Sequence, residues 1–259
     1  MLVPRRLAQS LIALLMIGTA SAACRRQDQP ATSAPPPALA PQPQPPRPAA
    51  DAPYCDFDLS GDKADHVFFL LGMRNELTGV VFQDGSDLLE DFFCNERDVA
   101  RTYQRVAATM QREQGLEADL RDETIQSCRT RYYSRSLARR VRSCFKPEDL
   151  GYGKSLNVAL FRREGGGPAW LTERGLTDDS FYRRRALAYL SGAWTRFHHA
   201  KDFEFYGGRG KAELVARLLD NLGCSRITIE STVGVAPGMT RVHFEPTDEV
   251  SAWLRKEWQ

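Results

Sequence analysis

The 259-residue sequence lacks two features that would point to a membrane-embedded or nucleic-acid-binding protein. Its N-terminal apolar run, Leu11 to Met16, is much shorter than the roughly 20 residues that a membrane-spanning helix needs. It also lacks an excess of either charge. The chain has 35 Lys and Arg residues against 33 Asp and Glu, and both counts are 33 once Arg5 and Arg6 are set aside. We therefore expect no nucleic-acid partner.

Complete catalytic motifs are missing as well. There is no Gly-x-Ser-x-Gly, and the glycine–lysine segments 151–155 and 207–211 lack the first glycine of a phosphate-binding loop. The segment from Asp56 begins like a calcium loop but has Val67 where a bidentate Glu is required. The sequence leaves catalysis undecided and favours a non-enzymatic function that uses no cofactor.

The first 23 residues have the pattern of a secretory signal peptide: a short cationic start, an apolar middle and small residues before Cys24. The segment SAAC at 21–24 resembles the end of a bacterial lipoprotein signal, in which the cysteine receives lipid, although Ser21 stands where Leu is usual. The segment ASA at 20–22 also fits ordinary signal cleavage. Lipidation of Cys24 and secretion in soluble form both remain open.

Residues 24–53 favour the lipid anchor. Ten of the fifteen prolines lie between Pro30 and Pro53, mixed with Ala and Gln, which predicts an extended, disordered linker. Such a spacer would separate an anchored domain from the membrane, whereas a domain that is free in solution has no need of one. Arg25, rather than Asp, follows the cysteine, and by the lipoprotein resemblance this implies the outer membrane of a Gram-negative bacterium. We expect a periplasmic protein attached to the membrane through its lipid.

The six cysteines indicate an oxidising compartment and disulfide bonds. If Cys24 carries lipid, five remain and one of them has no partner. A helical hairpin around residues 133–136 would bring Cys128 and Cys144 together, whereas an unbroken helix would hold them about 24 Å apart. Cys55 and Cys94 are the other disulfide candidates.

We predict an α+β fold with a helix-rich region at 54–149 and an α+β region at 150–259, which could share one core. Helices are expected to begin near Asp87 and Asn95 and to cover much of 117–144, and a strand is expected at 155–162. The last part, from Phe203 to Trp258, has the order β-α-β-β-α. This order resembles SPOR-type envelope modules, which bind peptidoglycan, and also the first part of ferredoxin-like units.

Two clusters are candidate binding sites. One is a basic stripe at helical spacing that could meet an anionic partner, or pair with the acids just upstream; it comprises Arg131, Arg135, Arg139, Arg142 and Lys146. The other is a candidate metal site, which comprises His198, His199, Asp202 and Glu204. The same residues also fit a simpler interpretation, in which the histidines stabilise the end of a helix and the acids lie on a solvent-exposed strand face.

Taken together, these features predict an envelope lipoprotein whose soluble domain binds an envelope protein or peptidoglycan without catalysis, as accessory or immunity proteins do. The alternative is a periplasmic hydrolase that uses the histidine cluster, with or without the help of a metal ion.

Overall fold

The computed structural model describes residues 57–75, 86–125, 128–149, 154–162, 168–170, 180–206, 209–232 and 238–258; at 143–149, 154–162, 168–170 and 181 it describes the backbone alone. Residues Met1–Arg47 form a separate unit from Pro48–Gln259. Every element described below belongs to the second unit. Within the described ranges, no helix is long and apolar enough to cross a bilayer.

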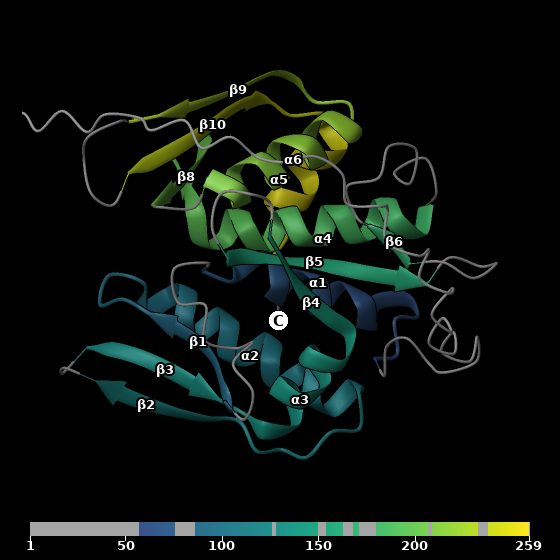
Figure 1. The fold of residues 1–259 in the computed structure, drawn as a ribbon, viewed down its shortest axis with the longest axis vertical. Helices are drawn as coiled ribbons and strands as arrows, with labels where there is room; N and C mark the ends of the chain where they lie inside the picture. The colour runs from purple at the N-terminus through teal and green to yellow at the C-terminus, as the bar shows by residue number, and fades with distance from the viewer. Residues whose placement is uncertain are drawn as a thin grey trace, which may run out of the picture. The chain divides into compact units, whose positions relative to one another are not determined.

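The domain contains the same element order, α-β-α-β-β-α, twice (Figure 1). The first half consists of α1 (Gly61–Met73), β1 (Leu88–Phe92), α2 (Arg97–Glu113), β2 (Arg121–Ile125), β3 (Arg129–Tyr133) and α3 (Arg135–Cys144). The second half consists of α4 (Ser180–Phe197), β8 (Asp202–Tyr206), α5 (Arg209–Asn221), β9 (Ser225–Ser231), β10 (Met239–Glu245) and α6 (Asp248–Leu254), with the two-residue strand β7 (His198–His199) before β8. Between the halves lie β4 (Phe145–Asp149), β5 (Lys154–Arg162) and β6 (Pro168–Trp170), which pair antiparallel in that order.

The two halves also share strand order and register. The first sheet has the order β1-β3-β2, and the second has β8-β10-β9 with β7 at its edge; all pairs are antiparallel. In each sheet the central strand carries an arginine that lies directly between two carboxylates. The register places Arg131 between Asp91 and Glu123, and Arg241 between Glu204 and Glu230. The chain is therefore a structural repeat of two half-domains.

Helices α1 and α4 form the contact between the halves, and they approach so closely that only glycine fits. A Cβ atom built on Gly72 would lie 2.0 Å from the carbonyl oxygen of Tyr189, and one on Gly192 would lie 1.9 Å from that of Phe69. No real Cβ comes so close to a backbone atom, so both helices need glycine at the crossing. The two glycines lie one on each helix at the same contact.

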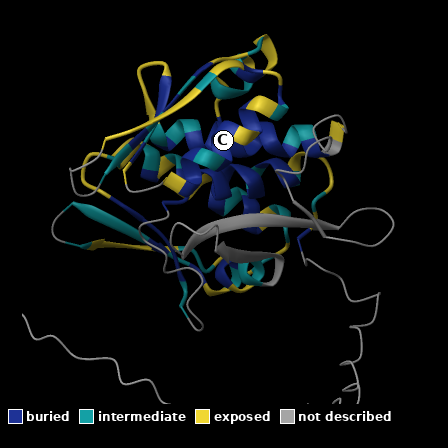
Figure 2. Ribbon diagram, turned by 45° about the horizontal axis from the view of Figure 1, so that its top comes forward, coloured by how far each residue is buried: buried dark blue, intermediate teal, exposed yellow. Residues whose placement is uncertain are grey.

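Helices α2 and α5 pack against the inner faces of the two sheets. On α2, buried residues recur at helical spacing (Ala100, Tyr103, Val106 and Met110), and Tyr103 packs against Phe92 and Tyr132 of the first sheet. On α5, Leu214, Val215, Leu218 and Leu219 are buried in the same way. Figure 2 shows the central helices in dark blue, whereas the outer strands carry intermediate and exposed residues.

Several predictions from the sequence are confirmed. The fold is α+β, a helix begins shortly after Asn95, a strand covers 155–162, and β8-α5-β9-β10-α6 has the predicted β-α-β-β-α order. Thr247 caps the last helix, since its side chain accepts a hydrogen bond from the Val250 amide.

Two predicted helices are wrong. The segment after Asp87 is the strand β1, because Glu90 points inward to a buried ion pair with Arg196 instead of capping a helix. The segment 117–144 holds the hairpin β2–β3 before α3 begins at Arg135. Alternating burial explains the hairpin: Tyr132 is buried, whereas Arg131 on the opposite face is partly exposed. The region 54–149 is consequently less helical than predicted.

The glycine contact gives a stability prediction. Gly192→Ala should lower the free energy of unfolding by about 3 kcal/mol, because the added methyl group overlaps the Phe69 carbonyl and forces α1 and α4 apart. Denaturant unfolding measures the change. Gly115→Ala is the matched control. Nothing lies within 4 Å of its Cβ position, so its only cost should be the strain of alanine at a φ of +61°, about 1 kcal/mol. A Gly192→Ala variant as stable as the parent protein would contradict the described crossing.

Candidate functional site

The C-terminal ends of α1 and α4 meet at a buried cluster of charged side chains. Arg196 lies 2.9 Å from Glu90 and 2.8 Å from Glu96, and it donates hydrogen bonds to the carbonyl groups of Met73 and Asp91. Burial opposes its charge, but the two glutamates outweigh this effect and raise the pKa of Arg196. The side chains of Arg196 and Glu90 have no exposed surface. This cluster holds the fold together and is closed to a substrate.

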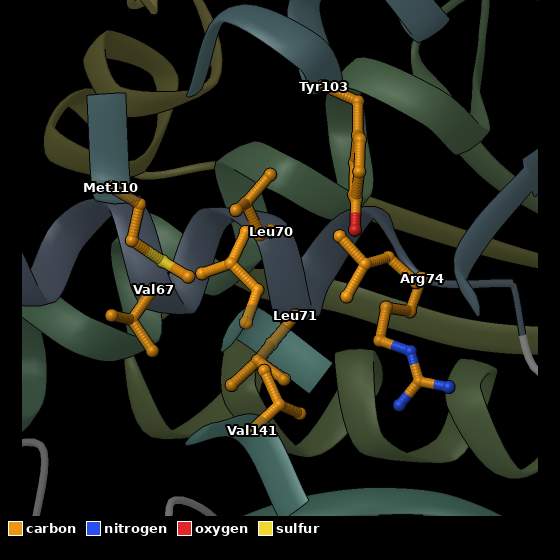
Figure 3. A pocket seen from close by; sticks show the side chains of 9 residues that line it. Val67, Leu70, Leu71, Arg74, Tyr103, Met110 and Val141 are labelled. Carbon is orange, nitrogen blue, oxygen red and sulfur yellow. The ribbon is translucent and has the colours of Figure 1, made fainter. Parts of the chain in front are cut away.

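An apolar cavity lies beside this cluster. Figure 3 shows Val67, Leu70 and Met110 on one side of it and Arg74 on another. Its volume is about 20 Å³, which is enough for a single water molecule. The cavity is therefore too small to bind a substrate or a cofactor.

The outer face of the first sheet carries arginines and aromatic rings. We call Phe93, Arg121, Arg129, Arg131 and Tyr133 the arginine–aromatic face. Arg121 stacks over the Tyr133 ring, 4.4 Å from its centroid, and Arg129 lies over Phe93 at 5.2 Å. Phe93 is 45% exposed. Flat cations on exposed rings are the groups that bind stacked bases and phosphates.

Two carboxylates lie on this face: Glu123 is exposed and accepts a hydrogen bond from the Tyr133 hydroxyl at 2.9 Å, whereas Asp91 is buried and positions two arginines. Asp91, whose side chain is 4% exposed, accepts hydrogen bonds from Arg129 at 2.6 Å and from Arg131 at 2.9 Å. The hydrogen bond to Asp91 raises the pKa of Arg131. Both arginine side chains remain about one-third exposed, at 29% and 33%. They are held in position without being removed from solvent.

A disulfide bond fixes the edge of the same face. Cys94 follows Phe93, Cys128 precedes Arg129, and the two cysteines are bonded with their Cα atoms 4.8 Å apart. This pair corrects the predicted Cys128–Cys144 bond, which assumed a helical hairpin that the chain does not form. Cys94 was a disulfide candidate and is bonded; Cys55 and the side chain of Cys144 lie outside the described residues.

The outer face of the second sheet has a different character. We call Asp202, Glu204, Glu230, Arg241 and His243 the imidazole face. The His243 ring lies between two carboxylates, with Nδ1 2.9 Å from Asp202 and Nε2 3.2 Å from Glu230. Arg241 lies 3.4 Å from Glu204. General acid–base chemistry uses groups of these types.

The predicted basic stripe is not one surface. Arg131 lies on β3, whereas Arg135, Arg139 and Arg142 lie on α3, where Arg142 donates to the Ser86 carbonyl. Lys146 lies on β4, and its side chain is outside the described residues. The stripe assumed a continuous helix, and the β3–α3 boundary divides it.

The four metal candidates do not form one site. His198 stacks on Trp194 and faces that residue's carbonyl at 2.7 Å. His199 lies 3.6 Å from Glu204, whereas Asp202 pairs with His243. In the part of the chain that the structure describes, no three His, Cys, Asp or Glu side chains are arranged to hold a metal ion.

Comparisons with known proteins add a distant likeness in fold. No family model matches the sequence, and no curated protein matches it. One similar solved structure is of mesophilic variants of the homing endonuclease I-DmoI, with 12% identity, a TM-score of 0.42, and coverage of 71% of this chain and 91% of that one. A second is an I-DmoI variant in complex with its target DNA, with 13% identity, a TM-score of 0.43, and coverage of 77% and 100%.

These findings correct two predictions. Both neighbours are structures of an endonuclease and one holds DNA, which contradicts a non-catalytic envelope protein bound to protein or peptidoglycan, and contradicts the exclusion of nucleic acid. At these TM-scores the likeness does not carry an activity to this chain. The proposals below rest on its own residues.

The pairing at Asp91 predicts that removing the two arginines destabilises the protein more than removing the carboxylate does. Replacing both partners, in Arg129→Gln/Arg131→Gln, should lower the free energy of unfolding by about 3 kcal/mol, because it leaves a buried carboxylate without a cation. Asp91→Asn should cost only about 1 kcal/mol, since both arginines still reach water. Adding Asp91→Asn to the double variant should restore most of the loss. Urea unfolding checks all three, and equal costs for the single and double variants would contradict the pairing.

Proposed function

We propose that the domain binds single-stranded nucleic acid through the arginine–aromatic face. The observation that supports this function most directly is the pair of cation–ring stacks, Arg121 on Tyr133 and Arg129 on Phe93, on one open sheet surface. Arginine pairs with phosphate through two parallel hydrogen bonds, and aromatic rings stack on bases of any sequence. The surface offers guanidinium groups and aromatic rings together, on β2, on β3 and just after the end of β1.

The flat sheet surface favours a single strand over a duplex. Arg129 and Arg131 are two residues apart on β3, so they project from the same face about 7 Å apart along the strand. Phe93 and Tyr133 lie at either end of this stretch of the face, where unstacked bases could rest on them. A duplex keeps its bases stacked internally and could not use the rings.

Binding should depend on salt and on the two arginines that stack. Arg121→Gln/Arg129→Gln should reduce the slope of log affinity against log salt concentration by about 1.4, or about 0.7 for each lost phosphate contact with a single strand. The measurement is fluorescence anisotropy of a labelled single-stranded DNA at several salt concentrations. Arg217→Gln is the charge control, because Arg217 is exposed on α5 of the other half-domain.

Phe93→Ala separates base contacts from phosphate contacts in the same assay. It should weaken binding by about 1–3 kcal/mol, the loss of one stacked base, while leaving the salt slope unchanged. Binding that is equal in the parent protein, the arginine variant and the Phe93 variant would refute the proposed face.

We also propose that Cys24 is lipidated and that the domain is displayed on the periplasmic side of the outer membrane. The cysteine inventory supports this. Cys94 and Cys128 are bonded, and Cys224 is a buried free cysteine whose pKa is raised by burial. That leaves Cys24, Cys55 and Cys144, an odd number. If Cys24 carries lipid, the other two can pair.

Intact mass spectrometry of the mature protein tests the anchor. We expect a chain that begins at Cys24 and carries the mass of its acyl groups, and we expect Cys24→Ala to abolish this modification. A mature chain that begins at unmodified Ala23 would contradict lipidation. The result is independent of nucleic-acid binding, which the soluble assay measures separately.

A further inference from the structure

The imidazole face has a layered arrangement of exposure. Asp202 and Glu204 are nearly buried, with side chains 11% and 10% exposed, whereas His243 and Arg241 are 29% and 32% exposed and Glu230 is 70% exposed. The inner carboxylates contact the inner sides of His243 and Arg241. The outer groups reach solvent. A substrate on this face would meet an imidazole, a guanidinium and a carboxylate that are supported from beneath.

His243 is oriented for proton transfer. Its Nδ1 lies 2.9 Å from the nearly buried Asp202, which fixes the ring. Its Nε2 is covered from solvent in this arrangement, lies 3.2 Å from Glu230 and makes no hydrogen bond to any described residue. A carboxylate accepts a hydrogen bond only from a ring nitrogen that carries a proton, so Glu230 would face a proton at Nε2 when one is present. The Nε2 proton is then close to a carboxylate but is not held by it.

Arg241 and Tyr206 complete the surface. Arg241 lies directly opposite Glu230 in the strand register, and its Nε has no hydrogen-bond partner among the described residues. Tyr206 lies on the same face as Glu204, two residues along β8, and is 57% exposed. The charge of Glu204 raises the pKa of Tyr206, so its ring stays neutral. An exposed neutral ring can stack on a base.

We infer that the imidazole face cleaves RNA by internal transphosphorylation without a metal ion, with Glu230 as general base, His243 as general acid and Arg241 as the group that stabilises the phosphorane. The ribose 2′-hydroxyl is the nucleophile, so the substrate class is RNA and DNA is excluded. This inference rests on the proposed single-strand binding only for delivery of the substrate, because its reacting groups lie on the other sheet.

The step balances in atoms and protons. The Glu230 side chain turns outward, and the phosphate enters between it and His243. Glu230 accepts the proton of the 2′-hydroxyl, and O2′ forms a bond to phosphorus. The bond from phosphorus to O5′ breaks, and O5′ takes the Nε2 proton of His243. The products are a 2′,3′-cyclic phosphate and a free 5′-hydroxyl.

Because the base and the acid lie close together, a proton can pass between them and restore their starting protonation states. After the step, Glu230 is protonated and His243 is neutral. When the products leave, Glu230 returns to within 3.2 Å of Nε2 and passes its proton to the ring. Asp202 is a positioning residue, because it touches the ring and not the substrate.

The test uses the purified full-length chain and a fluorescent DNA oligonucleotide with one central ribonucleotide, in buffer with excess EDTA. We expect cleavage at the ribonucleotide, with the cyclic phosphate identified by mass spectrometry. His243→Asn and Glu230→Gln should each reduce the rate at least 100-fold. Asp202→Asn should lower kcat and leave KM unchanged, whereas a loss of folding would show as a lower Tm. His198→Asn, which removes an exposed imidazole from the same sheet, should retain the full rate.

Several results would overturn the inference. They are no cleavage by the parent protein, equal cleavage by the His243→Asn variant, and cleavage of an all-DNA oligonucleotide. Anisotropy with the all-DNA strand separates this inference from the proposed function. Binding without cleavage refutes only the RNA-cleaving site. Cleavage at the ribonucleotide, together with binding that is equal in the parent protein and the Arg121→Gln/Arg129→Gln variant, refutes only the arginine–aromatic face.

Discussion

The close crossing of α1 and α4 is the constraint on which the rest of the structure depends. With glycine at positions 72 and 192, the two backbones come into direct contact. Helix α1 belongs to the first half-domain and α4 to the second, so this contact joins the two halves. The contact also brings polar helix ends into the interior. Lys211 donates to the carbonyl groups of Gly72 and Arg74, and Arg196 donates to that of Met73. These cations satisfy the carbonyl groups at the end of α1, where the helix dipole favours positive charge.

The repeat explains why two surfaces of unlike chemistry have the same geometry. Both central strands place an arginine between two carboxylates, so both sheets start from one pattern. The residue two positions further along differs: it is Tyr133 in the first sheet and His243 in the second. The first sheet thereby gains a stacking surface and the second a proton donor. One scaffold can support binding on one face and chemistry on the other because the outer side chains do not contribute to the core.

The sequence predicted the elements whose patterns are strictly local, and it failed where distant contacts decide. The strand at 155–162 and the β-α-β-β-α order of the last part follow from patterns along the chain itself. Glu90 resembled part of a helix cap because its partner, Arg196, lies 106 positions later. His243 had one carboxylate two positions away, at Glu245, but its actual partners are Asp202 and Glu230 on neighbouring strands. Only the strand register brings these groups together, and a register cannot be read from spacing along one strand.

Net charge does not describe a single face of the molecule, for a related physical reason. A chain with balanced charge can still concentrate one sign on a face, and at short range a phosphate responds to that face and not to the sum. On the first sheet, three arginines face solvent. Of the carboxylates on the same face, Asp91 is almost entirely buried beneath two of these arginines, whereas Glu123 is exposed beside Arg131. A buried counter-charge orients the guanidinium groups while leaving their outer edges to a ligand. Burial of the acids, more than their number, therefore decides which surface an anion meets.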